Sequence, residues 1–380
     1  MSARQLQAPY VPILHNVAVG LADRHVPYDS MRWLVLVLGL SALAQQPGTS
    51  TAAAPAQSAA PAQDTAMPAE PAQPFDRWLE DLVEEARSRG FAEDLVRETL
   101  ADLEPLHRVI SSDRSQAELN PGFDRYFANH TSRALVRRGR DLSKEHAALL
   151  GRIESTYDVQ RRFIVAIWGM ESRYGRIMGR TPVFQALATL AWEPRRASFF
   201  RGELFDALSM VSRGYIDAPS MTGSWAGAMG QTQFMPSSYL KYAVDFDGNG
   251  RRDIWRTTDD ALASIANYLK GFGWDDDETW GREVRVPAAA RAAIAETVPR
   301  RPEGCYAVRN MTERVPLDTW RKLGVTRADG GPLPEASVRA GLVDVGERHF
   351  LVYPNYDAIL GYNCAHYYAL TVAMLADQLR

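Results

Sequence analysis

The chain has 380 residues, a formal net charge of -3 and a hydrophobic content of 46%. This length suffices for two or three domains that each bury a core of their own. The near-neutral charge, together with the lack of any long basic run in the sequence, argues against a nucleic-acid-binding protein. Short basic clusters such as Arg195-Arg196 are typical of solvated helix faces.

The first 44 residues contain a targeting pattern that does not start at residue 1. Residues 1–30 show no coherent pattern, whereas Met31 and Arg32 precede an apolar run and an Ala-x-Ala site that ends at Ala44. This order is typical of a signal peptide, and the apolar run is too short to span a bilayer. We therefore expect residues 1–30 to be an artefactual leader, residues 31–44 to be a cleaved signal peptide, and the mature chain to be periplasmic without a membrane span. An uncleaved anchor is the alternative, and a lipid anchor is not expected because no cysteine follows the apolar run.

The next segments predict a tether and an N-terminal helical domain. Residues 45–74 are rich in Ala, Pro and Gln, a composition typical of a disordered linker. Apolar residues at helical spacing begin at Phe75 and predict helices over 75–83 and 92–103, then over 123–139 and 144–157. Residues 106–122 have no such period and are expected to be irregular. Residues 75–157 thus form the expected N-terminal α domain.

Residues 158–275 carry most of the motifs and form the expected catalytic core. In its first motif, Ile164, Ile167 and Trp168 share one helix face with Glu171. An acid on a buried helix face must be paired, protonated or chemically active. Apolar surroundings and the negative end of its own helix both raise the pKa of such a carboxyl.

A carboxyl with a raised pKa is what a general acid near neutral pH needs, so Glu171 is the candidate catalytic residue. Gly175 is expected to cap the end of this helix. The alternative is a core glutamate that forms an ion pair with Arg173 or Arg176.

The second motif covers residues 223–239. Small residues between Gly223 and Gly230 permit close approach of the backbone to a ligand or a helix, and Gln231 and Gln233 follow beside aromatic residues. Amides with aromatic neighbours are typical of sites that bind sugars. A tight loop that is packed for structural reasons alone is the alternative.

The third motif, at residues 245–256, resembles a calcium-binding loop. Oxygen ligands stand at positions 1, 3, 5 and 9, and glycine stands at position 6, as in an EF-hand. The match fails at position 12, where Arg256 replaces glutamate, although Asp259 or Asp260 could close a longer loop. A metal-free turn is the alternative. In either case the loop is interpreted as structural.

The remaining sequence predicts a small β-containing domain over residues 276–350, because valines recur in short alternations broken by Pro and Gly. Residues 351–380 predict a helix that returns to the core. Export would permit a disulfide between Cys305 and Cys364, but the sequence leaves two free buried thiols as an equal alternative. Motifs of zinc proteases, P-loops, serine hydrolases and dinucleotide-binding folds are absent from the sequence.

Together these motifs resemble those of the B-type lytic murein transglycosylases, a family of soluble and membrane-bound enzymes with a lysozyme-like core. The resemblance rests on residues 168–175, 227–239, 245–255 and 266–269, and it extends more weakly over residues 75–380. It implies a mainly α, α+β fold with a lysozyme-like core, an EF-hand-like loop, an N-terminal helical domain and a small β-containing domain.

The resemblance also implies roles for individual residues. Glu171 matches the single catalytic acid and base of the family, and no cofactor is implied for catalysis. The implied substrate-binding residues are Ser172, Ser224, Gln233, Tyr268, Tyr362, Asn363 and Tyr368, with Tyr126, Arg195, Arg196 and Phe199 at the border of the cleft. The implied ligands of a structural Ca²⁺ are Asp245, Asp247, Asn249, Arg251 through its carbonyl, and Asp260. Phe199 and Cys364 depart from the residues usual in the family, and Cys364 leaves open an atypical bridge to Cys305.

The implied reaction is cleavage of the β-1,4 bond between N-acetylmuramic acid and N-acetylglucosamine in peptidoglycan, with formation of a 1,6-anhydromuramoyl end and no consumption of water. Glycan strands are the expected partner, and other cell-wall enzymes are further candidates. A hydrolytic muramidase of the same fold and a non-catalytic peptidoglycan-binding protein are the alternatives.

Overall fold

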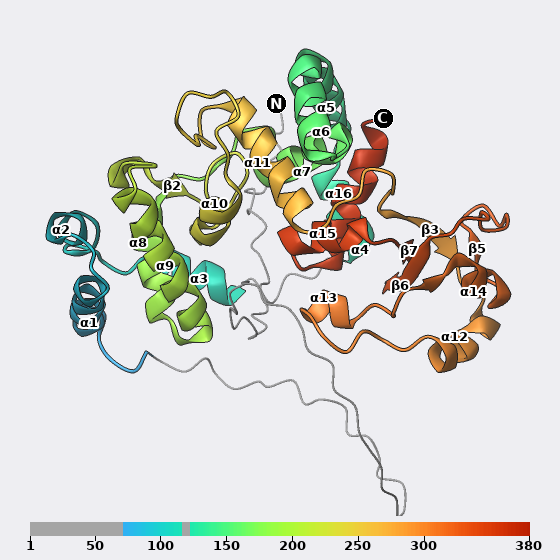
Figure 1. Cartoon of the computed structure of the whole chain (residues 1–380). Coiled ribbons are helices and arrows are strands. Elements are labelled where there is room, and N and C mark those ends of the chain that lie inside the picture. The colour runs from blue at the N-terminus through green and yellow to red at the C-terminus, as the bar shows by residue number, and fades with distance from the viewer. Residues whose placement is uncertain (1–70, 116–121) are drawn as a thin grey trace, which may run out of the picture. The chain divides into compact units, whose positions relative to one another are not determined.

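The fold is mainly helical with a small sheet, and the computed structural model describes residues 71–115 and 122–380 (Figure 1). The expected leader, signal peptide and most of the tether lie outside these residues. Within the described ranges, no helix has the length and apolar character needed to cross a membrane.

The N-terminal helices bury apolar stripes, as their spacing predicts. Helix α1 (Phe75–Ser88) and helix α2 (Glu93–Leu100) pack together, and Leu82 and Leu100 are fully buried. The expectation that residues 106–122 are irregular is wrong for residues 107–115, which form helix α3 (His107–Ser115), and residues 116–121 lie outside the described residues. The sequence of α3 is polar and lacks a helical stripe. Its buried carboxylate, Asp113, binds arginines from a distant segment, so tertiary ion pairs stabilise a helix that local periodicity does not reveal.

The helix predicted over residues 123–139 is in fact two helices, α4 (Phe123–His130) and α5 (Arg133–Glu145). The break falls at Ser132, whose hydroxyl accepts a hydrogen bond from the N–H of Leu135 (3.3 Å) and caps α5. Helix α6 (Ala147–Tyr157) follows directly.

Helix α7 (Arg161–Ser172) lies at the centre of the core. It packs against α5, α6, α11 (Thr258–Gly271) and α16 (His366–Gln378), as Figure 1 shows. Every residue from Phe163 to Ser172 is buried. A helix that is enclosed on all sides has little freedom to shift, so the position of its last turn is well determined. The remaining core helices are α8 (Val183–Trp192), α9 (Ala197–Ser212) and α10 (Pro236–Tyr242).

The strands expected between residues 276 and 350 are present and extend to residue 352. In the described part of the chain they form a five-stranded antiparallel sheet in the order β4-β6-β7-β3-β5. Its centre is the β6–β7 hairpin, in which Leu342 lies opposite Leu351. Leu342 and Leu351 join Trp320 in an apolar cluster that is separate from the main core. The elements of this region are β3 (Gly281–Arg285), α12 (Arg291–Thr297), α13 (Tyr306–Arg309), β4 (Val315–Pro316), α14 (Leu317–Lys322), β5 (Thr326–Arg327), β6 (Arg339–Val345) and β7 (Arg348–Val352).

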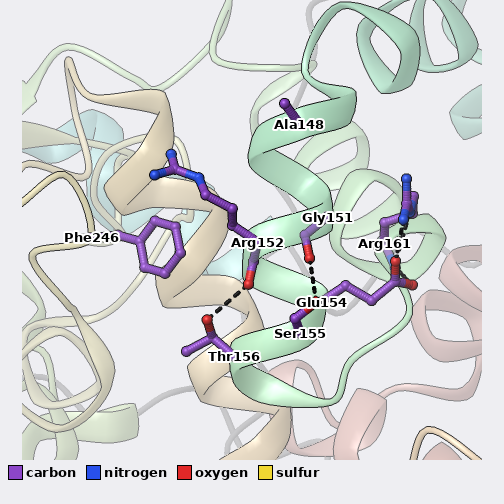
Figure 2. Close-up of a pocket in the computed structure, with 8 residues that line it drawn as sticks. All are labelled: Ala148, Gly151, Arg152, Glu154, Ser155, Thr156, Arg161 and Phe246. Atoms are coloured by element: carbon purple, nitrogen blue, oxygen red, sulfur yellow. Dashed lines mark hydrogen bonds and ion pairs between the residues drawn. The ribbon is translucent and has the colours of Figure 1, made fainter.

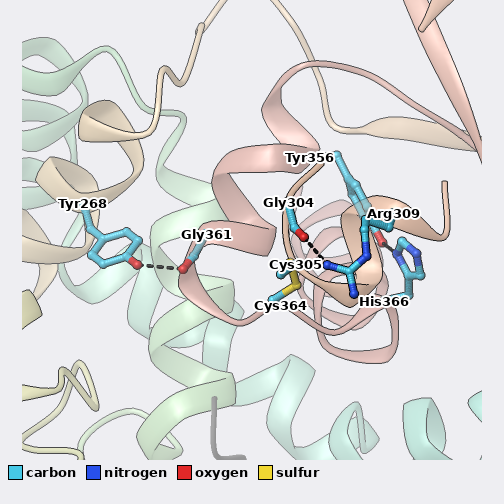
Figure 3. Close-up of a disulfide and its surroundings, with 8 residues drawn as sticks. All are labelled: Tyr268, Gly304, Cys305, Arg309, Tyr356, Gly361, Cys364 and His366. Atoms are coloured by element: carbon cyan, nitrogen blue, oxygen red, sulfur yellow. Dashed lines mark hydrogen bonds between the residues drawn. A yellow bond between two sulfur atoms is a disulfide. The ribbon is translucent and has the colours of Figure 1, made fainter. Parts of the chain in front are cut away.

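The C-terminal segment is also two helices and not one. Helix α15 (Asn355–Tyr362) ends before Asn363, and α16 begins at His366. Cys364 lies in this junction and forms a disulfide with Cys305, with the two Cα atoms 6.4 Å apart (Figure 3). The disulfide therefore joins the β-containing region to the α15–α16 junction, and it decides between the two possibilities that the sequence left open.

Replacing both cysteines by serine should destabilise the protein by about 4 kcal/mol, because the bridge closes a loop with a sequence separation of 59. Thermal or urea unfolding of the oxidised protein and of the double variant measures the difference. Reductant should shift the wild-type transition to that of the double variant and leave the double variant unchanged. Coincident transitions for the oxidised protein and the variant would contradict a stabilising bridge.

Candidate functional site

Glu171 lies on the last turn of α7, and its side chain is only 3% exposed. The hydroxyl of Tyr368 on α16 donates a hydrogen bond to Oε1 of Glu171 (2.5 Å). Burial raises the pKa of the Glu171 carboxyl to about 8, although the hydrogen bond from Tyr368 offsets part of the rise. The direction of this shift is the one expected from the sequence, and it favours the protonated carboxyl near neutral pH.

The chain leaves α7 through a left-handed turn. Arg173 (φ 49°) and Tyr174 (φ 62°) precede Gly175 (φ 77°), and the helix cap is Arg173 where Gly175 was expected. A non-glycine residue in this conformation costs about 1–3 kcal/mol and persists only where its surroundings enforce it. The turn directs the chain away from α7 immediately after Glu171.

Tyr174 anchors this turn to neighbouring helices. Its hydroxyl donates to the carbonyl of Leu135 (3.0 Å), and its ring lies against Gly139 and Gly169. A Cβ at Gly169 would lie 2.7 Å from the Tyr174 ring, so a larger residue there would displace the ring. Gly169 of the first motif thus has a packing role that the sequence did not reveal.

Three tyrosines from separate helices gather around Glu171. Tyr268 of α11 and Tyr362 of α15 have ring centroids 4.6 Å apart, and Tyr368 donates to Glu171. Burial raises the pKa of all three phenols, and the nearby Glu171 carboxylate raises each one further. The hydroxyl of Tyr268 donates to the carbonyl of Gly361 (2.7 Å; Figure 3), and that of Tyr362 to the carbonyl of Thr232 (2.7 Å).

Ser224 and Gln233 belong to the loop of the second motif, which faces this cluster of tyrosines. The amide of Gln233 donates to the carbonyls of Met178 (3.1 Å) and Gly230 (2.9 Å). The hydroxyl of Ser224 accepts from the N–H of Ala228 (3.0 Å). The structure therefore brings the loop against the segment that follows Glu171. These hydrogen bonds occupy some of the donors and acceptors of the Ser224 and Gln233 side chains.

Asn363 is buried beside Tyr362, and neither side-chain polar atom has a hydrogen-bond partner within the described residues. The buried indole N–H of Trp225, next to Ser224, also has no hydrogen-bond partner within the described residues. A buried unpaired polar group costs about 1–3 kcal/mol. Such groups at a site are therefore suited to pair with a polar ligand.

The border residues form two groups. Tyr126 of α4 stacks on His130 (4.2 Å between centroids) and lies near enough to Tyr368 to raise the pKa of its phenol. Arg195, Arg196 and Phe199 form the other group, in which the two arginines lie on the 3-10 turn Pro194–Arg196 just before α9 and Phe199 lies in the first turn of α9. Both arginines bind the buried carboxylate of Asp113, and Phe199 packs edge-on against Phe200. Although burial opposes it, hydrogen bonding to the arginines lowers the pKa of Asp113.

Two polar residues of the motifs form hydrogen bonds with other groups of the protein. Ser172 is fully buried, and its hydroxyl donates to the carbonyl of Gln231 (2.7 Å) and accepts from the N–H of Gly175 (3.0 Å). Gln231, interpreted from its motif as a sugar-binding amide, accepts a hydrogen bond at Oε1 from the indole of Trp168 (2.9 Å). The two glutamines of the motif thus differ in their surroundings, which their spacing alone does not show.

The third motif brings carboxylates together. Oxygens of Asp245, Asp247 and Asp260 lie within 4.8 Å of one another, which suits a hard cation. Asp260 points into the loop and accepts from the N–H of Phe246 (2.8 Å), whereas Asp259 binds Arg152 on α6 (3.3 Å). The structure thus selects Asp260 as the acid that closes the loop. The loop geometry is completed by Asn249, whose Oδ1 accepts from the N–H of Arg251 (2.9 Å).

A separate pocket lies between α6 and this acidic loop (Figure 2). Arg152 faces the ring of Phe246 across it (5.5 Å), and Arg161 pairs with Glu154. None of the residues expected to bind substrate or metal lines this pocket. It is therefore distinct from the cluster around Glu171.

Glu203 on α9 is another buried carboxyl, which sequence analysis missed. Burial raises its pKa to about 7, and its oxygens accept from the N–H (2.9 Å) and hydroxyl (2.7 Å) of Ser237. These contacts cap the first turn of α10, so Glu203 has a structural role. Burial and a raised pKa therefore do not by themselves identify a catalytic acid, because the contacts of the carboxyl must be considered as well.

Comparisons with known proteins agree on one family. The family described as Transglycosylase SLT domain matches residues 74–377. Membrane-bound lytic murein transglycosylase B of Escherichia coli (strain K12) is 33% identical over 306 residues, covering 76% of this chain and 78% of that protein. SltB3 from Pseudomonas aeruginosa, solved in complex with NAG-anhNAM-pentapeptide, is 40% identical with a TM-score of 0.72, covering 81% of this chain and 80% of that one. The Escherichia coli lytic transglycosylase Slt35, solved in complex with calcium, is 28% identical with a TM-score of 0.67, covering 83% of this chain and 97% of that one. The fold class predicted from the sequence is confirmed.

Replacing Glu171 by glutamine should stabilise the protein at alkaline pH. The folded pKa of about 8 exceeds the ordinary value of 4.5, so ionisation of Glu171 costs folding free energy that is absent below pH 4.5 and complete above pH 8. The full difference corresponds to about 5 kcal/mol. Thermal unfolding across this range should show Glu171→Gln gaining on the wild type as pH rises. A gain that does not depend on pH would contradict the raised pKa.

Proposed function

The chain belongs to the transglycosylase SLT family, as its motifs predict, and we propose that it cleaves peptidoglycan glycan strands with Glu171 as the single acid and base. The observation that supports this most directly is the buried carboxyl of Glu171, which accepts a hydrogen bond from Tyr368 and whose pKa is raised by its burial. A proton donor of this kind is what cleavage of a glycosidic bond requires.

The proposed substrate is the β-1,4 bond between N-acetylmuramic acid and N-acetylglucosamine. SltB3 was solved with a NAG-anhNAM-pentapeptide, which is a fragment of this polymer. Asn363 offers a buried amide whose donor and acceptor are both unpaired, and an acetamido group complements both. Tyr268 and Tyr362, which are 6% and 1% exposed, form part of the enclosure around the acid.

In the first proposed step, the protonated carboxyl of Glu171 donates its proton to the glycosidic oxygen as the bond to C1 breaks. The muramoyl acetamido group stabilises the positive charge that develops at C1. Glu171, now a carboxylate that accepts from Tyr368, removes the proton of the C6 hydroxyl, and the C6 oxygen bonds to C1. The acid is restored, a 1,6-anhydromuramoyl end is formed, and no water is consumed.

Enclosure of the acid favours ring closure over hydrolysis. Glu171 is 3% exposed, and a site that excludes water protects a reactive sugar cation from attack by solvent. The hydrolytic muramidase of the same fold is the alternative, and it differs in its products by one water. A non-catalytic peptidoglycan-binding protein would need no protonated acid at this position.

We further propose that the acidic loop holds a structural Ca²⁺. Asp245, Asp247 and Asp260 would supply carboxylates, with Asn249 and the carbonyl of Arg251 as additional oxygens, and Slt35 was solved in complex with calcium. The ion would stabilise the loop and take no part in the reaction. Because the substrate lies in the cell wall, we propose a periplasmic location, consistent with the signal peptide expected at residues 31–44.

Glu171→Gln should lower the rate of release of soluble fragments from purified sacculi by about 10³-fold, because glutamine cannot donate or accept the proton. Binding to sacculi and thermal unfolding below pH 4.5 should be unchanged. Mass spectrometry of wild-type products should show ends lighter by one water than hydrolytic ends. Products of hydrolytic mass would support the muramidase, and bound but undigested sacculi would support the non-catalytic protein.

Ca²⁺ should raise the thermal midpoint relative to EDTA, with about 3 kcal/mol gained at a hundredfold excess over the dissociation constant. Asp247→Asn should abolish this shift, because Asp247 faces the other carboxylates of the loop. Asp259→Asn is the matched control, because Asp259 binds Arg152 and should leave the shift intact. Equal midpoints in Ca²⁺ and EDTA, or a shift that survives Asp247→Asn, would contradict a site in this loop.

A further inference from the structure

Gln231 connects two parts of the site that are far apart in the sequence. It is 5% exposed, and its backbone and side chain both form hydrogen bonds to other segments. Its Oε1 accepts from the indole N–H of Trp168 (2.9 Å), and its carbonyl accepts from the hydroxyl of Ser172 (2.7 Å). Both partners lie in the C-terminal half of α7.

These two partners flank the acid. Trp168 precedes Glu171 by three residues, so it lies one turn earlier on the same helix face, and Ser172 follows it directly. The Ser172 hydroxyl also accepts from Gly175 of the left-handed turn (3.0 Å). Gln231 therefore holds the end of α7 on both sides of Glu171.

On its other side, Gln231 is attached to the end of the acidic loop. Its N–H donates to the carbonyl of Ile254 (2.8 Å), and its amide nitrogen approaches the carbonyl of Trp255 (3.4 Å). Gly230 permits this approach, because a Cβ there would lie 2.7 Å from the Ile254 carbonyl oxygen. Trp255 is itself fixed by a hydrogen bond from its indole to the carbonyl of Thr222 (3.1 Å).

We propose that Gln231 is a positioning residue for Glu171, fixing the last turn of α7 against the acidic loop through Trp168 and Ser172. This inference rests on the proposed function of Glu171. Unlike Gln233, Gln231 uses its amide oxygen for a contact within the core, so sugar binding is not its role. Without that oxygen, the buried indole N–H of Trp168 lacks its acceptor. The helix end must then shift or admit water, and either change exposes Glu171.

The test variant is Gln231→Met, which keeps the length of the side chain and removes its polar atoms. The matched control is Tyr239→Phe, which removes one hydrogen bond from α10 to the same loop, at the carbonyl of Arg252 (2.9 Å), and touches neither Trp168 nor Ser172. Each variant is combined with Glu171→Gln. The stabilisation by Glu171→Gln is then measured above pH 8 and below pH 4.5, a readout that does not depend on activity.

In the wild type and in Tyr239→Phe, Glu171→Gln should stabilise the protein more above pH 8 than below pH 4.5. In Gln231→Met that pH-dependent gain should fall to less than about half, because a partly hydrated carboxyl ionises at lower cost. The rate of sacculus digestion by Gln231→Met should fall about ten- to a hundredfold, and that of Tyr239→Phe less than about threefold. An undiminished gain in Gln231→Met, or equal rate losses in both variants, would overturn the proposal.

A double-mutant cycle tests the proposed route through the indole. If Gln231 acts through Trp168, then Trp168→Phe and Trp168→Phe/Gln231→Met should digest sacculi at rates within about threefold of each other. Multiplicative losses would overturn this route. Failure of the wild-type protein to digest sacculi would instead refute the proposed function, while the stability measurements would still report on Gln231.

Discussion

The site depends on one constraint, which is that an ionisable carboxyl is kept in the core at the buried end of helix α7. Glu171 can occupy that place because the neutral acid is tolerated where a carboxylate is not, and because Tyr368 donates to it. Helices α11, α15 and α16 each contribute a tyrosine to the enclosure. The same burial that costs stability at high pH supplies a proton donor at neutral pH.

Positioning of the acid is a separate requirement, and two groups of residues meet it. On one side, Tyr174 packs against Gly169 and anchors the left-handed turn that follows α7. On the other side, Gln231 connects the end of α7 to the acidic loop through Trp168 and Ser172. A structural Ca²⁺ in that loop would therefore stabilise a segment that contacts the end of α7, although it lies outside the reaction itself. In this view, direct contacts hold the acidic loop and the end of α7 together.

Much of this arrangement was predictable from the sequence, because a motif reports chemistry that is local in the chain. The acid, its raised pKa, the strand region and the family all follow from short patterns. The polar helix α3 and the disulfide were not predictable, because each depends on partners distant in sequence. The break at Ser132 depends on a local cap to Leu135, which the apolar periodicity of residues 123–139 concealed. Gln231 and Gln233 illustrate this limit. Both are glutamines of the same motif, and only the fold shows that the side chain of Gln231 contacts Trp168. Likewise, the sequence offered Asp259 and Asp260 equally, and the fold selects Asp260.

The central claim is that the carboxyl of Glu171 stays protonated in the folded protein until the pH approaches 8. Infrared difference spectroscopy of the wild type against Glu171→Gln, recorded as a function of pH, observes that carboxyl directly. A protonated carboxyl band that is absent from the variant and disappears near pH 8 is the predicted result. Loss of the band near the ordinary value of 4.5 would mean that Glu171 is a carboxylate at neutral pH, and the account of the site as a buried proton donor would be wrong.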